Sequence, residues 1–202
     1  MDEVAYDPRT ALVVVDVQND FADPGGNLYV RGGQEVVPVI NDEIQKAQAA
    51  GAPVFYTADW HPESTPHFAK DGGIWPVHCV AETWGAEFHP DLIVDGPVVR
   101  KGANGEDGYS GFTMRDPLSE QAIPTELSGL LRERGVTRLV VCGLATDYCV
   151  KSTALDALAE GFAVRLLLDA VRSVDLQEGD GVRALGGVEG AGGALVGRSG
   201  PA

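Results

Sequence analysis

The 202-residue chain has little basic charge, few cysteines and no long apolar run. Lysine and arginine together number 15 against 30 aspartates and glutamates, which gives a formal net charge of −15. That balance argues against a nucleic-acid partner and against docking on an anionic membrane, because both need a basic surface. The three cysteines are an odd number and show no disulfide framework. No window approaches the roughly 18 uncharged apolar residues of a membrane span, and no signal peptide is visible. We therefore expect a cytoplasmic protein with reduced thiols.

What the chain does contain is a regular alternation of strand and helix patterns, at a length that suits one domain over residues 1–202. Continuous apolar runs predict strands at residues 10–17, 53–58, 97–100, 138–142 and 162–168, and a last one near 194–196. Helices are expected at residues 36–50, 126–134 and 147–160, with a short one around 182–185. This alternation predicts an α/β fold: three α/β/α layers around a mostly parallel, roughly six-stranded, Rossmann-like sheet.

Two segments interrupt this pattern. Residues 59–95 contain little regular structure and hold all four histidines of the chain, so we expect a functional, metal-binding loop there. Residues 179–200 are rich in glycine, and we expect loose order toward their end.

The most informative stretch follows the strand expected at 138–142. Gly143 interrupts that strand, and Thr146 has the character of an N-cap for the next helix. Cys149 would then lie in the first helical turn, where free N–H groups and the helix dipole favour a thiolate and an oxyanion. The alternative is that Cys149 packs under the helix as a small apolar residue.

Four strand ends place complementary groups at one edge of the predicted sheet. Asp16, Asp59 and Lys101 end three strands, and Cys149 follows a fourth. Ligands of parallel sheets bind at that edge. Lys101 would lower the pKa of the thiol, and Asp16 could act as general base and then acid. Taken singly, Asp16 could be a turn residue and Lys101 a solvated side chain, whereas Arg100 should point to the opposite face.

A second group is suited to a metal ion. Asp59 and His61 are two residues apart in an extended segment and so face the same way, and His67 and His78 follow in the same loop. This mixed oxygen and nitrogen set fits zinc, iron or manganese. The alternative is a set of histidines that brace a loop. Aromatic residues near glycines, namely Phe21, Trp75 and Tyr109, point to a small flat ligand or to ordinary packing.

Several motifs resemble one family across residues 13 to about 169. They are VVVDVQNDF at 13–21, PGGNL at 24–28, ADWHP at 58–62, WPVHCV at 75–80, GAEFHP at 85–90, KG and YSGF within 101–112, and GLATDYCV at 143–150. In this order they resemble the isochorismatase-like cysteine hydrolases, and among these the nicotinamidase branch.

The resemblance implies specific roles for residues of this chain. It implies a catalytic triad of Asp16, Lys101 and Cys149, and a site for one divalent metal ion, zinc first, at Asp59, His61 and His78 with His67 as an additional ligand. Phe21 and Trp75 would sandwich a pyridine ring, with Leu28 and Tyr109 close by. A cis peptide at Leu144–Ala145 would turn the N–H groups of Ala145 and Cys149 toward an oxyanion, so Leu144 and Ala145 are also expected to bind the substrate.

The resemblance also implies hydrolysis of nicotinamide to nicotinate and ammonia through a cysteine thioester, as in NAD salvage. Two alternatives stay open: a related cysteine hydrolase acting on another small amide, and a non-enzymatic metal-binding or thiol redox protein. The expected partner is the small-molecule substrate, and self-association is left open.

Overall fold

A computed structural model gives the fold of this chain and describes residues 4–197. The far end of the glycine-rich stretch, beyond residue 197, lies outside the described residues. Within the described range, no helix combines the length and the apolar character needed to cross a bilayer.

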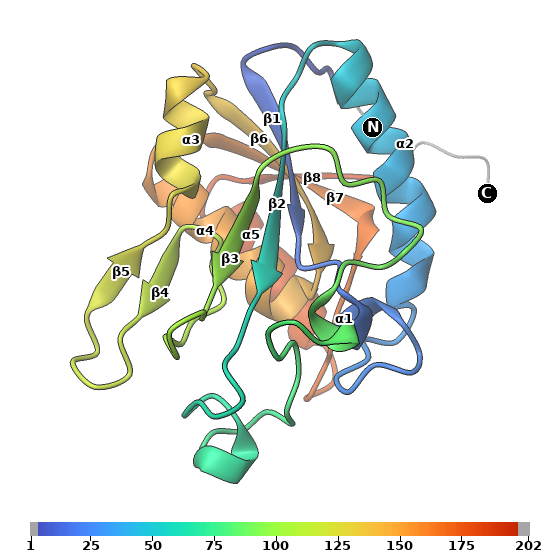
Figure 1. The fold of residues 1–202 in the computed structure, drawn as a ribbon. Coiled ribbons are helices and arrows are strands. Elements are labelled where there is room, and N and C mark those ends of the chain that lie inside the picture. Colours follow the sequence, from blue (N-terminus) through green and yellow to red (C-terminus); the bar gives the residue numbers. More distant parts are fainter. Residues whose placement is uncertain (1–3, 198–202) are drawn as a thin grey trace.

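The centre of the molecule is a six-stranded sheet in the order β3-β2-β1-β6-β7-β8, and all of its neighbouring strands pair in parallel (Figure 1). The predicted α/β class is thus confirmed. The strands are β1 Thr10–Val15, β2 Val54–Asp59, β3 Val98–Lys101, β6 Arg138–Leu144, β7 Ala163–Arg172 and β8 Ala194–Val196.

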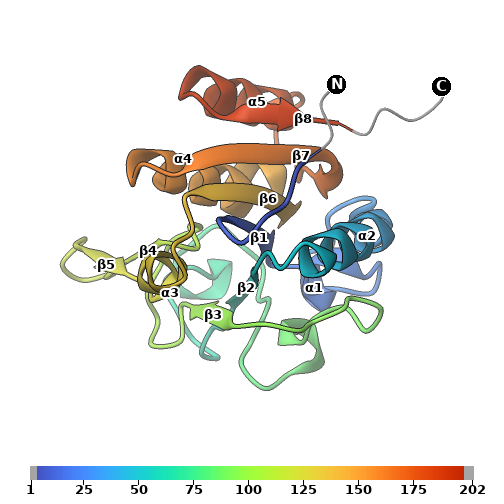
Figure 2. The ribbon, with the colours of Figure 1, turned by 90° about the horizontal axis from the view of Figure 1, so that it is seen from above.

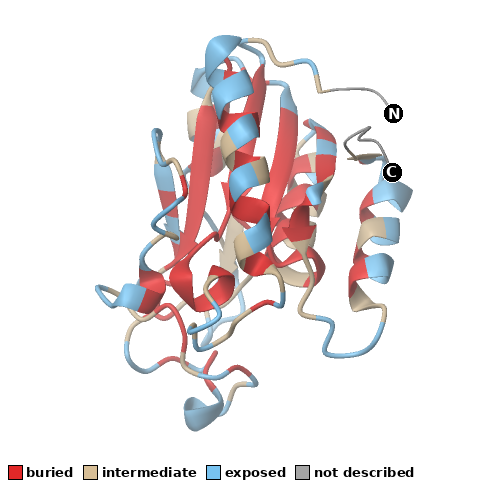
Figure 3. Ribbon diagram, turned by 90° about the vertical axis from the view of Figure 1, so that its right-hand side faces the viewer, coloured by how far each residue is buried: buried red, intermediate tan, exposed pale blue. Residues whose placement is uncertain are grey.

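Helices cover both faces of this sheet, which completes the three layers (Figure 2). On one face lie α1 Asn19–Ala22 and α2 Val36–Ala49, and on the other α3 Leu127–Glu133, α4 Lys151–Ala159 and α5 Asp180–Gly190. All residues of β1 and β2 are buried, as continuous apolar runs predict for strands covered on both sides (Figure 3). Each helix contributes one apolar face to one of two cores, and the sheet separates these cores.

The segment that carries Cys149 differs in detail from the expectation. Strand β6 does not stop at Cys142 but continues to Leu144, through Gly143 at φ +114°. A Cβ atom on Gly143 would lie 2.1 Å from the carbonyl oxygen of Val15, so only glycine fits between these strands. A cis peptide joins Leu144 to Ala145, as the family resemblance implied.

The chain then forms a π-helical turn, Thr146–Val150, and continues directly into α4. The predicted N-cap at Thr146 is wrong: Ala145 occupies that position and makes no side-chain cap bond. Cys149 nevertheless lies in the first turn of this continuous helical segment.

Two further elements differ from the expectation, whereas the segment after β2 contains little regular structure, as expected. Residues 113–124 form an antiparallel hairpin, β4 Thr113–Arg115 with β5 Ala122–Pro124, which the sequence analysis does not anticipate. Helix α5 is much longer than the short helix expected around 182–185. The irregular segment after β2 contains only two short 3₁₀ helices, Ala69–Asp71 and Trp84–Ala86, and a third, Gly33–Glu35, precedes α2.

Candidate active site

The topology brings four polar residues together at the carboxyl edge of the sheet. Asp16 follows β1, Asp59 and Lys101 are the last residues of the adjacent strands β2 and β3, and Cys149 follows β6. From β1 the chain first adds β2 and β3 on one side and later β6, β7 and β8 on the other side. The order of the strands therefore reverses at β1. Such a switch point opens a crevice at the carboxyl edge, and Asp16 and Cys149 flank it.

Lys101 is the hub of this cluster. Its ammonium nitrogen Nζ lies 2.8 Å from Asp16 Oδ2, 2.8 Å from Asp59 Oδ1 and 3.6 Å from Cys149 Sγ, and it donates to the carbonyl oxygen of Tyr109 at 3.1 Å. The lysine is only 1% exposed. A charged group at this depth needs partners of opposite charge, and the two carboxylates supply them.

Each member of the cluster has a shifted pKa. Burial raises the pKa of Asp16, and the Lys101 ammonium offsets this only in part. Burial alone would lower the pKa of Lys101, but Asp16 and Asp59 raise it well above its usual value. Burial alone would raise the pKa of Asp59, but Lys101 and His61 hold it well below its usual value. The site therefore holds a fixed ammonium, a fixed carboxylate at Asp59, and a carboxyl at Asp16 that accepts a proton more readily than usual.

Lys101 lowers the pKa of the Cys149 thiol, as expected, but the net shift is in the opposite direction. Burial raises the pKa of Cys149 well above its ordinary value, and Lys101 counters this only in part. The reason is that Asp16 and Asp59 already neutralise the ammonium, so little positive field is left for a thiolate. A carboxylate oxygen of Asp16 lies within 4.8 Å of the Cys149 sulfur, which places a proton acceptor near the thiol.

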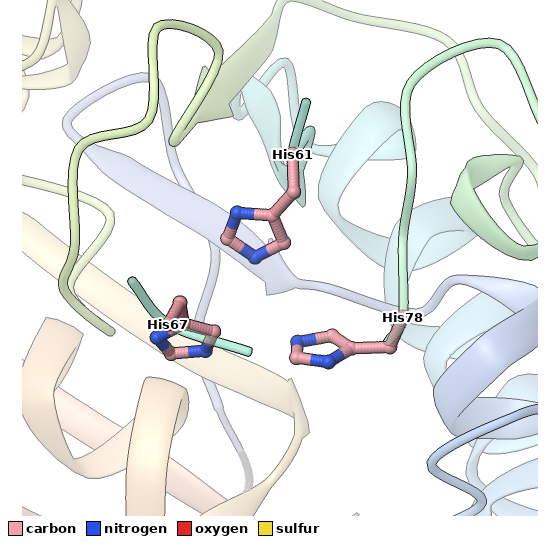
Figure 4. Close-up of side chains that lie close together, drawn as sticks. All are labelled: His61, His67 and His78. Atoms are coloured by element: carbon pink, nitrogen blue, oxygen red, sulfur yellow. The ribbon is translucent and has the colours of Figure 1, made fainter. Parts of the chain in front are cut away.

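Three buried histidines form a second cluster next to the first. One ring nitrogen from each of His61, His67 and His78 lies within 4.8 Å of the others, and the rings face a common space (Figure 4). Asp59 Oδ2 lies 3.8 Å from His61 Nε2 and 4.0 Å from His78 Nε2. The structure thus brings together all four residues that the sequence analysis proposed as ligands.

The donor atoms of this cluster fit a metal ion. Both ring nitrogens of His61 are buried without a hydrogen-bond partner. His78 Nδ1 donates to the carbonyl oxygen of Pro76 at 2.7 Å, which leaves its Nε2 with a lone pair, and burial lowers the pKa of His78 to about 4. Asp59 Oδ1 forms an ion pair with Lys101 but accepts no hydrogen bond from the residues that the structure describes. Imidazole nitrogens without a hydrogen-bond partner, next to a carboxylate, are the kind of ligand set that a divalent transition metal prefers.

Backbone packing and a buried amide hold these ligands in place. A Cβ atom on Gly102, at φ +77°, would lie 2.7 Å from His61 Nδ1, so only glycine allows the ring this position. Gln18 accepts from the N–H of Asp59 at 2.8 Å and donates to its carbonyl oxygen at 2.7 Å. No role was expected for Gln18 from the sequence, although Gln18 lies two residues after Asp16 in the motif at 13–21.

A small pocket lies between the two clusters, and Asp59, His67, His78 and Cys149 all contribute to its wall. Of the six residues proposed for substrate binding, five line it: Phe21, Leu28, Trp75, Tyr109 and Ala145. Leu144 does not; it is the last residue of β6, and its side chain lies with those of Val140 and Cys142 in the buried core beside α2.

Three residues of the pocket wall were missed by the sequence analysis: Val30, Tyr148 and Val174. The Tyr148 ring packs edge-on against Trp75 at 4.8 Å between centroids, and Trp75 Nε1 donates to the hydroxyl of Tyr109 at 3.0 Å. These three aromatic rings form one side of the pocket. Only the position of Tyr148 beside Cys149 could have indicated its role from the sequence.

Arg100, His89 and Cys79 belong neither to the two clusters nor to the pocket wall. Arg100 is exposed and stacks on Trp60 at 4.0 Å, on the side opposite Lys101 as expected. His89 accepts from the N–H of Asp91 and is not part of the histidine cluster. The Cys79 thiol is buried against the carbonyl oxygen of Gly85 at 3.8 Å.

Several known proteins are similar to this chain in sequence and in fold over most of their length. The family model described as "Isochorismatase domain" matches residues 10–191. The nicotinamidase of Escherichia coli K12 is 37% identical over 93% of this chain and 94% of its own. The crystal structure of the pyrazinamidase of Pyrococcus horikoshii in complex with zinc matches with a TM-score of 0.84 at 43% identity, over 95% of this chain and all of that one. The PnC1 protein of L. infantum, crystallised with nicotinate, matches with a TM-score of 0.87 at 34% identity, over 96% of each chain. The chain therefore belongs to the isochorismatase-domain family.

Proposed function

We propose that this chain hydrolyses nicotinamide to nicotinate and ammonia, a reaction of NAD salvage, with Asp16, Lys101 and Cys149 as its catalytic residues. One observation carries the proposal. The buried Lys101 ammonium contacts both the Asp16 carboxylate and the Cys149 sulfur at one wall of a small pocket, and the histidine cluster forms another wall. The similarity to a nicotinamidase over nearly the whole chain supports the choice of substrate.

The shape of the pocket supports a flat aromatic amide. Trp75, Tyr109 and Tyr148 provide apolar ring surface, and Phe21 lies 5.4 Å from the His78 ring between centroids. Polar groups lie at the two ends: the thiol with its acid and cation at one, the histidines at the other. A pyridine ring carrying a carboxamide has the same order of groups, with an apolar ring between a reactive carbonyl and a basic nitrogen.

In the first half of the reaction the thiol attacks the amide carbon. The proton of Cys149 passes to the nearby Asp16 carboxylate, and the sulfur forms a bond to the carbonyl carbon. Proton transfer and attack occur together, since the resting thiol is neutral. The Lys101 ammonium stabilises negative charge on sulfur as the proton leaves, and the N–H groups of Ala145 and Cys149 stabilise the oxyanion.

The second half releases both products and restores the thiol. Asp16 returns the proton to the amide nitrogen as the C–N bond breaks, and ammonia leaves. A water molecule then attacks the thioester while Asp16 takes one of its protons. The C–S bond breaks, nicotinate leaves, and the proton on Asp16 returns to the sulfur. The raised pKa of Asp16 suits this repeated exchange, because the carboxyl accepts a proton more readily than an ordinary aspartate.

Asp59, His61, His67 and His78 would hold one divalent metal ion, with zinc as the first choice and iron or manganese as alternatives. When bound, the ion supplies a Lewis-acid contact for the pyridine nitrogen, which orients the ring. The donor set of three imidazoles and a carboxylate supports this assignment, as does the pyrazinamidase crystallised with zinc.

The direct test is product formation by the purified, metal-loaded protein. We expect equal amounts of ammonia and nicotinate from nicotinamide. Removal of the metal with a chelator, and the substitution His61→Ala, should each lower turnover at least about tenfold, and His61→Ala should also lower the bound metal. His89→Ala removes the histidine outside the cluster and should change neither.

The outcomes separate the alternatives. Release of ammonia from a ureido or carbamoyl compound but not from nicotinamide would identify the chain as a cysteine hydrolase of another small amide. Metal binding without turnover of any of these amides would identify a non-enzymatic metal-binding or redox protein. Full metal binding and turnover by His61→Ala would contradict the proposed metal site.

A further inference from the structure

Asp107 lies between β3 and β4 and belongs neither to the catalytic cluster nor to the proposed ligands. Its Oδ1 accepts from His67 Nδ1 at 2.7 Å, and its Oδ2 accepts from Arg115 Nη2 at 2.7 Å. Its backbone pairs with that of Arg115 in both directions, at 2.8 and 2.6 Å. The N–H of Gly108 adds a bond to Oδ1 at 2.9 Å. This carboxylate is therefore fixed in position by strand β4.

The contact with Asp107 determines how the His67 ring presents its nitrogens. The other oxygen of the Asp107 carboxylate forms an ion pair with Arg115, at 2.7 Å between Oδ2 and Nη2. An ionised carboxylate only accepts, so His67 Nδ1 must carry the hydrogen. That leaves Nε2 as the ring nitrogen available to a metal.

The orientation of the ring agrees with this tautomer. The His67 side chain is 6% exposed, and its ring lies 5.0 Å from that of His61 and 5.4 Å from that of His78, between centroids. Figure 4 shows that the three rings surround one space. A ring turned over would bring Nδ1 away from Asp107 and lose the charge-assisted bond.

We propose that Asp107 is a positioning residue that sets the tautomer and orientation of His67, so that His67 Nε2 acts as a metal ligand beside Asp59, His61 and His78. The inference rests on the metal site of the proposed function and extends it to the hairpin β4–β5. Outer carboxylates of this kind hold metal-binding imidazoles in a defined tautomer, and their loss weakens metal binding by about 10- to 100-fold.

The test measures the affinity of the metal-free protein for Zn²⁺, by competition with a chromophoric chelator. We expect Asp107→Ala to bind Zn²⁺ about 10- to 100-fold more weakly than the unaltered chain. Asp107→Asn should lose less, since its amide oxygen still accepts from Nδ1. Asp116→Ala is the matched control: this carboxylate caps the turn of the same hairpin through Leu118 and Ser119, and its loss should leave Zn²⁺ affinity unchanged.

A double-mutant cycle separates positioning from general loosening of the structure. In a His67→Ala background, Asp107→Ala should have no further effect on Zn²⁺ affinity, whereas a merely structural role would make the two losses add. Circular dichroism and thermal unfolding establish that each variant is folded. If Asp107→Ala is not folded, Asp107→Asn replaces it in the cycle.

Unchanged Zn²⁺ affinity in Asp107→Asn and Asp107→Ala, or additive losses in the cycle, would overturn the inference. His61→Ala distinguishes this failure from failure of the metal site itself. If His61→Ala loses Zn²⁺ while the Asp107 variants do not, only the role of Asp107 is wrong. If His61→Ala also binds normally, the metal site is wrong.

Discussion

Cys149→Ala is expected to lower nicotinamide turnover by about 10⁴-fold or more, because no other group can form the bond to the amide carbon. The sulfur is the atom at which Asp16 and Lys101 converge, and the pocket opens onto it. The initial rate of ammonia release measures the effect. Bound metal should be unchanged, since the proposed ligands are Asp59 and the three histidines.

Cys142→Ala is the matched control for this prediction. It makes the same chemical change in a cysteine of β6 whose thiol points to the carbonyl oxygen of Val13. It should keep turnover within a few-fold of normal. If Cys149→Ala retained more than about 1% of the rate, covalent catalysis by this residue would be wrong, because loss of a nucleophile costs far more.

Lys101→Met should affect both catalysis and folding, because it removes the one cation between two buried carboxylates. Asp16 and Asp59 would be left facing each other, with one oxygen of each within 4.8 Å of the other and of the Cys149 sulfur. Loss of one partner from a buried pair lowers the free energy of unfolding by about 3–5 kcal/mol. Turnover should fall at least about 100-fold, as for other preorganised charges at a reacting centre.

Lys46→Met is the control for Lys101→Met. Lys46 also pairs with a carboxylate, Glu43 at 2.7 Å, but its side chain is 44% exposed. Its loss should change the free energy of unfolding by no more than about 1 kcal/mol and leave turnover unchanged. Denaturant titration and the rate of ammonia release check both variants. Equal stabilities of the two variants would show that Lys101 does not neutralise the buried acids.

The sequence predicted the features that depend on composition and on the order of elements. Continuous apolar runs identified the strands of the sheet, because a strand covered on both faces cannot alternate. Residues at the ends of parallel strands must meet at one edge of the sheet, and this rule alone predicts that Asp16, Asp59, Lys101 and Cys149 lie together.

What the sequence did not predict depends on contacts between distant residues. The hairpin β4–β5 consists of two three-residue strands that are exposed or half-buried, so no apolar alternation marks them. Helix α5 contains Gly186 and Gly187, which lower helix propensity, and packing of Ala184 and Val188 compensates. The pairing of Asp107 with His67 spans 40 residues and leaves no local signal.

The charge state of the thiol was mispredicted for the same reason. A lysine and a helix start near a cysteine favour a thiolate when each acts alone. In the folded chain burial disfavours the thiolate. In addition, the carboxylates of Asp16 and Asp59 already neutralise the Lys101 ammonium. For this reason the proposed mechanism includes proton transfer to Asp16 during attack, a step that depends on the three-dimensional arrangement.

The most direct measurement is the identity of the covalent intermediate. Isotopically labelled nicotinamide is mixed with the enzyme, the reaction is quenched in acid within one turnover, and the digested protein is analysed by mass spectrometry. The account predicts one nicotinoyl group on the peptide that carries Cys149 and none on those with Cys79 or Cys142. Full turnover with no acylated peptide, or with the label on another cysteine, would contradict it.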